Sequence, residues 1–149
     1  MAVSGFLNAK KQPLRSYEDI HVFYGAQPTY HPQMVATGRK SHSRGRRVDR
    51  TVNHYGAFAD TPVADTDEQY PRSILSLPRP KEGLHPTQKP VDLCRWLVRT
   101  FTDRGQLVLD PTCGSATTLV AAKAEGRRAV RIEATEAYCE VAAKRLAQM

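Results

Sequence analysis

The chain has 149 residues, enough for one domain with a buried core, and its 40% hydrophobic and 25% charged residues are ordinary for a globular protein. No apolar run reaches the length of a membrane span or a signal peptide, and neither the three cysteines nor the five histidines show metal-ligand spacing. The composition therefore argues against a membrane protein, a disulfide framework and a metal site, and it predicts a protein of the reducing cytoplasm.

The net charge of +7 is distributed unevenly along the chain. Six basic residues lie close together against one acid, Asp49: they are Arg39, Lys40, Arg44, Arg46, Arg47 and Arg50. DNA is a natural partner for such a cluster, because each phosphate that a basic side chain neutralises releases bound counterions. A solvated loop that keeps the chain soluble explains the same composition, so charge alone leaves both interpretations open.

The first predicted element is a strand over residues 20–24, Ile-His-Val-Phe-Tyr, which is rich in β-branched and aromatic residues and ends at Gly25. Residues 31–84 show little periodic apolar pattern and are rich in Pro, Gly, Ser, Arg and His. They are predicted to form a long irregular segment with one short strand over residues 73–78. A loop of that length in a compact domain is usually functional or disordered.

The pattern becomes regular after residue 85. A helix is predicted over residues 90–101, a strand over 106–110, a helix over 116–125, a strand over 127–133 and a last helix over 136–147 with Thr135 at its N-cap. A tight loop containing glycine joins the first strand to the helix that follows it. This order predicts a parallel βαβ unit with a right-handed crossover.

Two acids mark a candidate binding site in this unit. Asp110 ends the first strand before the turn through Gly114, where the backbone can approach a ligand and offer free N–H donors. Glu133 ends the next strand about twenty residues later, where nucleotide-binding folds place a carboxylate that accepts from ribose hydroxyls. A purely structural turn gives the same pattern, so one loop glycine does not decide between the two.

The motif HPTQKPVDLCRWLVRTF, followed by LVLDPTCGSATTLVAAKAEGRRAVRIEATEAYCEVAAKRL, closely resembles the beta-type DNA amino-methyltransferases. Members of this family transfer a methyl group from S-adenosylmethionine to adenine N6 or cytosine N4. The segment over residues 6–34 resembles the stretch that follows the family's catalytic loop, and residues 34–84 then take the place of its target-recognition region.

The resemblance implies an α/β fold, an incomplete Rossmann-like methyltransferase sheet with an irregular basic insertion. It implies three regions: a strand segment over 1–33, a DNA-facing recognition region over 34–84 and an S-adenosylmethionine-binding βαβ region over 85–149. A hydroxyl and an ammonium of HPTQKP would hold the methionine carboxylate, and a glutamate would hold the ribose. The implied cofactor residues are Thr87, Lys89, Asp110, Pro111, Cys113, Gly114, Ser115 and Glu133.

The chain departs from the family pattern at its cofactor loop. Thr112 stands where the family has an aromatic residue, and Ala116 stands where it has a second glycine. Alanine there is tolerated if its φ is helical, whereas the loss of the aromatic ring removes packing area. Ala134, Thr135 and Glu136 also replace a typical Leu-Asp-Pro. These changes predict a reduced affinity for S-adenosylmethionine.

The family's catalytic loop, (D/N/S)PP(Y/F), has no counterpart, because no two prolines are adjacent in the sequence. No catalytic residue is therefore assigned, and a truncated methyltransferase that is inactive alone is predicted. The alternatives are one half of a split enzyme completed by a second polypeptide, a non-enzymatic DNA-binding protein that uses the basic cluster, and a decayed remnant. An exposed edge of the strand over 106–110 would favour self-association.

Overall fold

The computed structural model describes residues 10–13, 16–38 and 66–148, and it confirms the α/β class. The described residues form two units, one within Met1–Gln33 and Arg72–Met149 and the other within Met34–Pro71. The second unit contains one antiparallel ladder, in which β1 (Val35–Ala36) pairs with β2 (Glu68–Gln69). The basic cluster over residues 39–50 lies outside the described residues. The functional division into 1–33, 34–84 and 85–149 remains a prediction.

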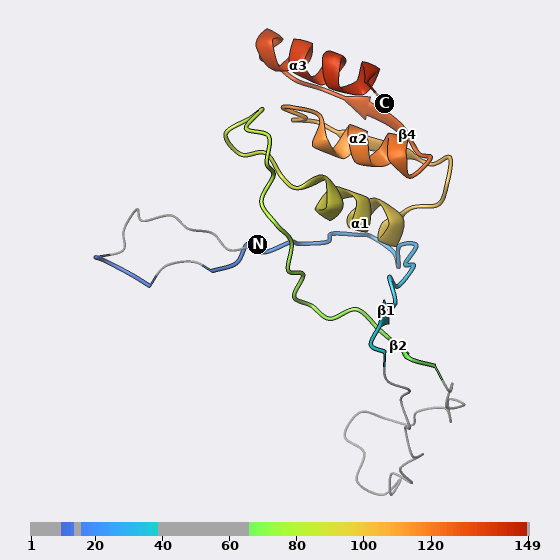
Figure 1. Ribbon diagram of the computed structural model, residues 1–149. Coiled ribbons are helices and arrows are strands. Elements are labelled where there is room, and N and C mark those ends of the chain that lie inside the picture. Colours follow the sequence, from blue (N-terminus) through green and yellow to red (C-terminus); the bar gives the residue numbers. More distant parts are fainter. Residues whose placement is uncertain (1–9, 14–15, 39–65, 149) are drawn as a thin grey trace, which may run out of the picture. The chain divides into compact units, whose positions relative to one another are not determined.

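The first unit is built on a parallel βαβ arrangement (Figure 1). Strand β3 (Leu107–Asp110) pairs in parallel with β4 (Arg128–Arg131), in a register that places Leu107 opposite Arg128 and Asp110 opposite Arg131. Helix α2 (Thr117–Ala124) makes the connection between them, and α3 (Glu136–Ala147) follows β4. The predicted strands and helices of this region are therefore confirmed, with ends that differ by at most a few residues.

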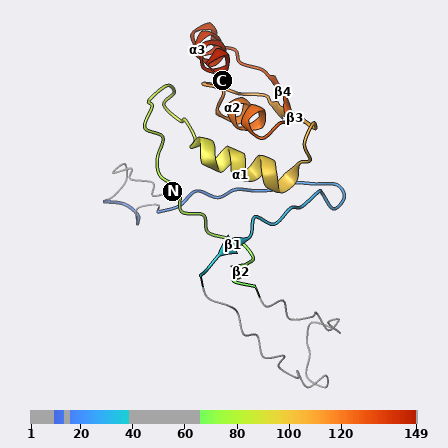
Figure 2. The same cartoon turned by 45° about the vertical axis from the view of Figure 1, so that its right-hand side comes forward.

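Helix α1 (Val91–Phe101) precedes the βαβ arrangement and begins directly after Pro90, whose backbone is extended. Its buried residues are Cys94, Val98 and Thr100, and α1 packs against α2. Thr100 is fully buried and donates its hydroxyl proton to the carbonyl of Trp96, 2.7 Å away, so its polar atom is satisfied. Figure 2 shows α1, α2 and α3 in succession, with α2 between the other two.

The core lies where α2, α3 and the loop after β3 meet. Cys113, Ala116, Leu119 and Ala142 are buried together, and Ala129 and Leu146 pack against them. These side chains are mostly small, so the helices approach the sheet closely. None of the helices in the described ranges is long and apolar enough to cross a membrane.

The other face of the two-stranded sheet is open. Side chains alternate along each strand, and the outward set is Arg128 and three apolar residues: Leu107, Leu109 and Val130, which are 55%, 58% and 46% exposed. Ile132, just after β4, is 57% exposed. The described residues thus leave an apolar surface uncovered, which is the feature on which the predicted self-association depends.

The strand predicted over residues 20–24 is wrong for this structure, because none of its residues pairs in a ladder. Phe23 is 90% exposed, and Ile20 and Val22 are about half exposed. The strand predicted over 73–78 is also absent, and Ile74 is 83% exposed. β-branched and aromatic residues favour strands because they pack on a half-buried pleated surface, and neither segment pairs with a strand among the described residues.

Candidate functional site

The carboxyl ends of β3 and β4 meet at one edge of the sheet, because the strands are parallel. Glu133, two residues beyond β4, accepts a hydrogen bond from the backbone N–H of Gly114 at 2.8 Å and another from Thr135 at 2.9 Å. The loop after β3 is tied to β4 a second time, since the N–H of Cys113 donates to the carbonyl of Ile132 at 3.0 Å. The two predicted acidic strand ends and the glycine loop therefore form one site.

The two backbone N–H donors to Glu133 favour its charged form. The N–H groups of Thr135 and Gly114, in that order, hold the pKa of Glu133 below its ordinary value of 4.5. Hydrogen bonds to the carboxylate favour its charged form. The stability that they give to the loop is therefore fully present at a pH above the ordinary pKa of 4.5. It is lost only as the pH falls through the lowered pKa. Glu133 is therefore a carboxylate at neutral pH.

The loop after β3 has a fixed backbone shape. The Asp110 side chain accepts from the N–H of Thr112 at 3.1 Å, and the N–H of Ala116 donates to the carbonyl of Cys113 at 2.7 Å. Gly114 has a φ of +49°, in the left-handed region that glycine adopts without cost.

Ala116 also lies in the left-handed region, with a φ of +63° and a ψ of 33°. The helix predicted over residues 116–125 therefore begins one residue later, at Thr117, with Ala116 as its N-cap residue, and the condition of a helical φ for an alanine at this position is not met. The Cβ of alanine costs about 1–2 kcal/mol in this conformation. The chain keeps the backbone turn that suits a glycine, even though its sequence has an alanine there.

His85 connects the HPTQKP segment to this loop. A Cβ placed on Gly114 would lie 3.1 Å from the Cδ2 atom of the His85 ring, so the ring fills the space beside the glycine. The same ring lies on Tyr138 of α3, with centroids 4.3 Å apart. The hydroxyl and the N–H of Thr87 lie 3.1 and 3.2 Å from Nδ1 of His85. Thr87 thus supports the histidine that packs against the loop.

The predicted site residues do not include His85 and Tyr138. Both belong to the motifs that carry the family resemblance. No spacing of residues in a sequence, however, predicts that a ring will pack against a glycine. Only the approach of the two segments in space identifies the pair.

Lys89 lies apart from the loop contacts. Its Nζ atom is 2.7 Å from Oε2 of Glu18, and the two side chains are 46% and 38% exposed. The ammonium thus holds a carboxylate, the same chemical group that the resemblance assigns to it as a ligand. An exposed pair of this kind contributes about 0–1 kcal/mol, so a ligand carboxylate can displace Glu18 at little cost.

Two further predicted site residues of the loop have buried side chains. Cys113 and Ser115 are buried, and burial, followed by nearby Asp110, raises the pKa of the Cys113 thiol, so this sulfur is not a reactive thiolate. No cluster of metal-ligating side chains occurs among the described residues. The predicted DNA-binding residues Arg39, Lys40, Arg44, Arg46, Arg47 and Arg50 lie outside them.

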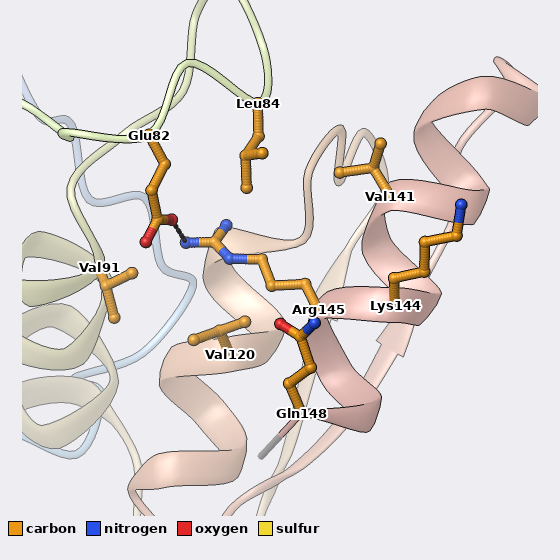
Figure 3. Close-up of a pocket in the computed structure, with 8 residues that line it drawn as sticks. All are labelled: Glu82, Leu84, Val91, Val120, Val141, Lys144, Arg145 and Gln148. Atoms are coloured by element: carbon orange, nitrogen blue, oxygen red, sulfur yellow. Dashed lines mark ion pairs between the residues drawn. The ribbon is translucent and has the colours of Figure 1, made fainter.

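Two hollows lie elsewhere in the first unit. One, of about 660 Å³, runs along α1 and is lined by Trp96, Leu97 and Phe101 together with parts of residues 16–22 and 72–77. The other, of about 600 Å³, lies behind the loop, between α2, α3 and residues 82–84 (Figure 3). Neither of these two hollows is lined by Asp110, Gly114 or Glu133. At the loop edge Asp110 and Glu133 are partly exposed, whereas Gly114 is buried.

Known proteins that resemble the chain are methyltransferases. A family model described as DNA methylase matches residues 4–144. The type II methyltransferase M2.DpnII of Streptococcus pneumoniae is 47% identical over 64 residues, which are 43% of this chain and 24% of the relative. The DNA adenine methyltransferase YhdJ of Escherichia coli is 27% identical over 150 residues, which cover 96% of this chain and 49% of the relative. The chain thus spans about half the length of that relative.

A solved structure, described as the complex of M1.HpyAVI with SAM, is 39% identical to the chain. The matched part covers 49% of this chain and 36% of that chain, with a TM-score of 0.46.

Proposed function

Because the chain belongs to the DNA methylase family, we propose that residues 85–149 form the S-adenosylmethionine-binding part of a DNA amino-methyltransferase. The reaction that we infer is methyl transfer to adenine N6 or cytosine N4. The observation that carries the proposal is the Glu133 carboxylate, bound to the N–H of Gly114 at the carboxyl edge of a parallel βαβ unit.

The residues present fit this cofactor. Each oxygen of Glu133 accepts one backbone N–H, which leaves lone pairs for ribose hydroxyls. Gly114 has no Cβ, which lets the His85 ring pack directly against the backbone of the loop. When bound, S-adenosylmethionine supplies an electrophilic methyl group. The chain's own residues bind and orient it. Glu133 accepts from the ribose hydroxyls, and Thr87 and Lys89 hold the methionine carboxylate. The loop lies against the methionine and ribose through Asp110, Pro111, Cys113, Gly114 and Ser115.

The catalytic loop is assigned to another polypeptide segment. The family's (D/N/S)PP(Y/F) loop holds the target base after it has left the duplex, and no two prolines are adjacent in this sequence. We propose that a segment outside these 149 residues supplies the loop, on the same or on a second polypeptide, and that these residues alone bind cofactor without methylating DNA. The three free thiols of Cys94, Cys113 and Cys139 fit a reducing cytoplasm as the place of action.

Calorimetric titration of the purified chain with S-adenosylmethionine tests the cofactor assignment. Saturable binding of one equivalent is expected, and binding of ATP, which lacks the methionine, is expected to be weak. Circular dichroism on the same sample establishes that it is folded. A folded sample that binds neither ligand would contradict the proposal.

The DNA partner is assigned to the basic cluster over residues 39–50. We expect that replacing Arg44, Arg46 and Arg47 together with alanine weakens DNA binding and makes it less dependent on salt. The slope of log affinity against log salt should fall by about 0.9 for each phosphate that the variant no longer neutralises. The measurement is fluorescence anisotropy of a labelled duplex over a series of salt concentrations.

A second triple variant, Lys10, Lys11 and Lys144 to alanine, removes the same net charge elsewhere and serves as the matched control. Equal effects of the two triple variants would show that net charge, and not the cluster, attracts DNA. That outcome would remove the assignment of DNA to residues 39–50.

A further inference from the structure

Arg145, in the last turn of α3, reaches across to the loop after β3. Its Nη1 atom donates to the carbonyl of Ser115 at 3.0 Å and to the hydroxyl of Thr117 at 3.1 Å. The side chain is only 12% exposed. Because both bonds come from a charged donor, they are stronger than ordinary hydrogen bonds.

Glu82 lies on the other side of the guanidinium, with its Oε2 atom 3.5 Å from Nη2 (Figure 3). The Glu82 side chain is 65% exposed, so this ion pair contributes little. Figure 3 also shows the Arg145 stem in the hollow that Val91, Val120 and Val141 line. The loop, not Glu82, is therefore the main partner of the charged group.

The two loop partners of Arg145 flank Ala116, which lies between them with a φ of +63°. A non-glycine residue keeps such a conformation only where the surrounding structure holds it. Arg145 donates to the Ser115 carbonyl before this residue and to the Thr117 hydroxyl after it. The turn that it fixes also contains Gly114, whose N–H points at Glu133.

We propose that Arg145 is a positioning residue of the cofactor site: it holds Ala116 in the left-handed conformation and so keeps the N–H of Gly114 directed at Glu133. The identity of the ligand, S-adenosylmethionine, rests on the proposed function. The hold on Ala116 rests on the contacts alone, so the two are tested separately.

A double-mutant cycle tests the positioning role in the folded chain. Arg145→Met keeps the stem and removes the charged donors, and it is expected to lower S-adenosylmethionine affinity by about tenfold. Ala116→Gly alone should change the affinity by no more than about threefold. Since glycine adopts the left-handed conformation unaided, Arg145→Met should lose most of its effect in the Ala116→Gly background. An undiminished loss in that background would overturn the proposal.

The matched control is Lys144→Met, which replaces the neighbouring cation on the same helix. Lys144 is 76% exposed and its contact with Glu140 is long, at 3.8 Å. No change in affinity is expected for this variant. A loss as large as that of Arg145→Met would show that positive charge on α3, and not the grip on the loop, matters, and it would overturn the proposal.

A second measurement needs no ligand. The ¹³Cα and ¹³Cβ shifts of Ala116 report its backbone conformation, and they should move away from left-handed values in Arg145→Met and stay unchanged in Lys144→Met. If Arg145→Met does not fold, Thr117→Val removes one acceptor at constant shape and should shift Ala116 less but in the same direction. Unchanged shifts in the folded variant would overturn the proposal. Shifts that move in a chain without cofactor affinity would retain the positioning role and overturn only the proposed function.

Discussion

Replacing Gly114 with alanine is expected to lower S-adenosylmethionine affinity by about 30-fold to 100-fold. A side chain at a φ of +49° costs about 1–2 kcal/mol, and its Cβ would lie 3.1 Å from the His85 ring. Displacing that ring from Tyr138 costs about 1 kcal/mol more. In the free variant the loop relaxes to avoid these costs. Ligand binding must then return the loop to its original conformation, and the free energy that this takes is lost from binding. Calorimetry on the folded variant measures the loss.

Gly83→Ala is the matched control, since a Cβ there meets nothing within 4 Å. It should bind like the parent chain. The double variant Gly114→Ala with His85→Ala removes the steric clash but not the backbone strain, so it should recover only part of the affinity. A folded Gly114→Ala chain with parental affinity would mean that the loop plays no part in binding.

Glu133→Ala is expected to reduce S-adenosylmethionine affinity by about 100-fold. The variant loses the acceptor for the proposed ribose hydroxyls, and it also releases the N–H groups of Gly114 and Thr135, which fix the loop. Glu133→Gln keeps the shape and one acceptor oxygen but not the charge, and an intermediate loss is expected. Titration calorimetry of the three chains at neutral pH gives the ranking.

Glu140→Ala is the control, because this glutamate of α3 is exposed and its contact with Lys144 is long, at 3.8 Å. The pH dependence supplies an independent check. The affinity of the parent chain should hold down to the ordinary glutamate pKa of 4.5 and fall only below it, because Glu133 stays charged to a lower pH. An affinity that falls well above that value would mean that another group controls binding.

The predicted elements that proved right are those whose signal is local. Apolar periodicity predicts α1, a short apolar run after turn residues predicts β3, and the segments between and after the glycines predict α2, β4 and α3. The parallel pairing follows from the order of these elements, because a helix that connects two strands returns the chain to the same edge of the sheet. The union of Asp110, Gly114 and Glu133 at one edge was therefore predictable.

The failed predictions concern residues whose state depends on distant neighbours. Residues 20–24 have strong strand propensity, but propensity forms no strand without a partner ladder, and the described residues provide none. Ala116 has a left-handed backbone because the residues around it are held from α3, a contact between positions far apart in sequence. The pairing of Lys89 with Glu18 spans a still longer separation. No pattern within a short window carries such information.

The contacts of the candidate site have a consequence for heredity. His85 packs beside Gly114 and on Tyr138, and Gly114 donates to Glu133, so every one of these contacts joins residues within 85–149. Residues that lie in one contiguous stretch of sequence are inherited together. A gene rearrangement that moves or fuses the stretch carries these contacts with it, provided that the break falls in an exposed connection. Under the proposed function, selection then acts on this site separately from the segment that holds the target base.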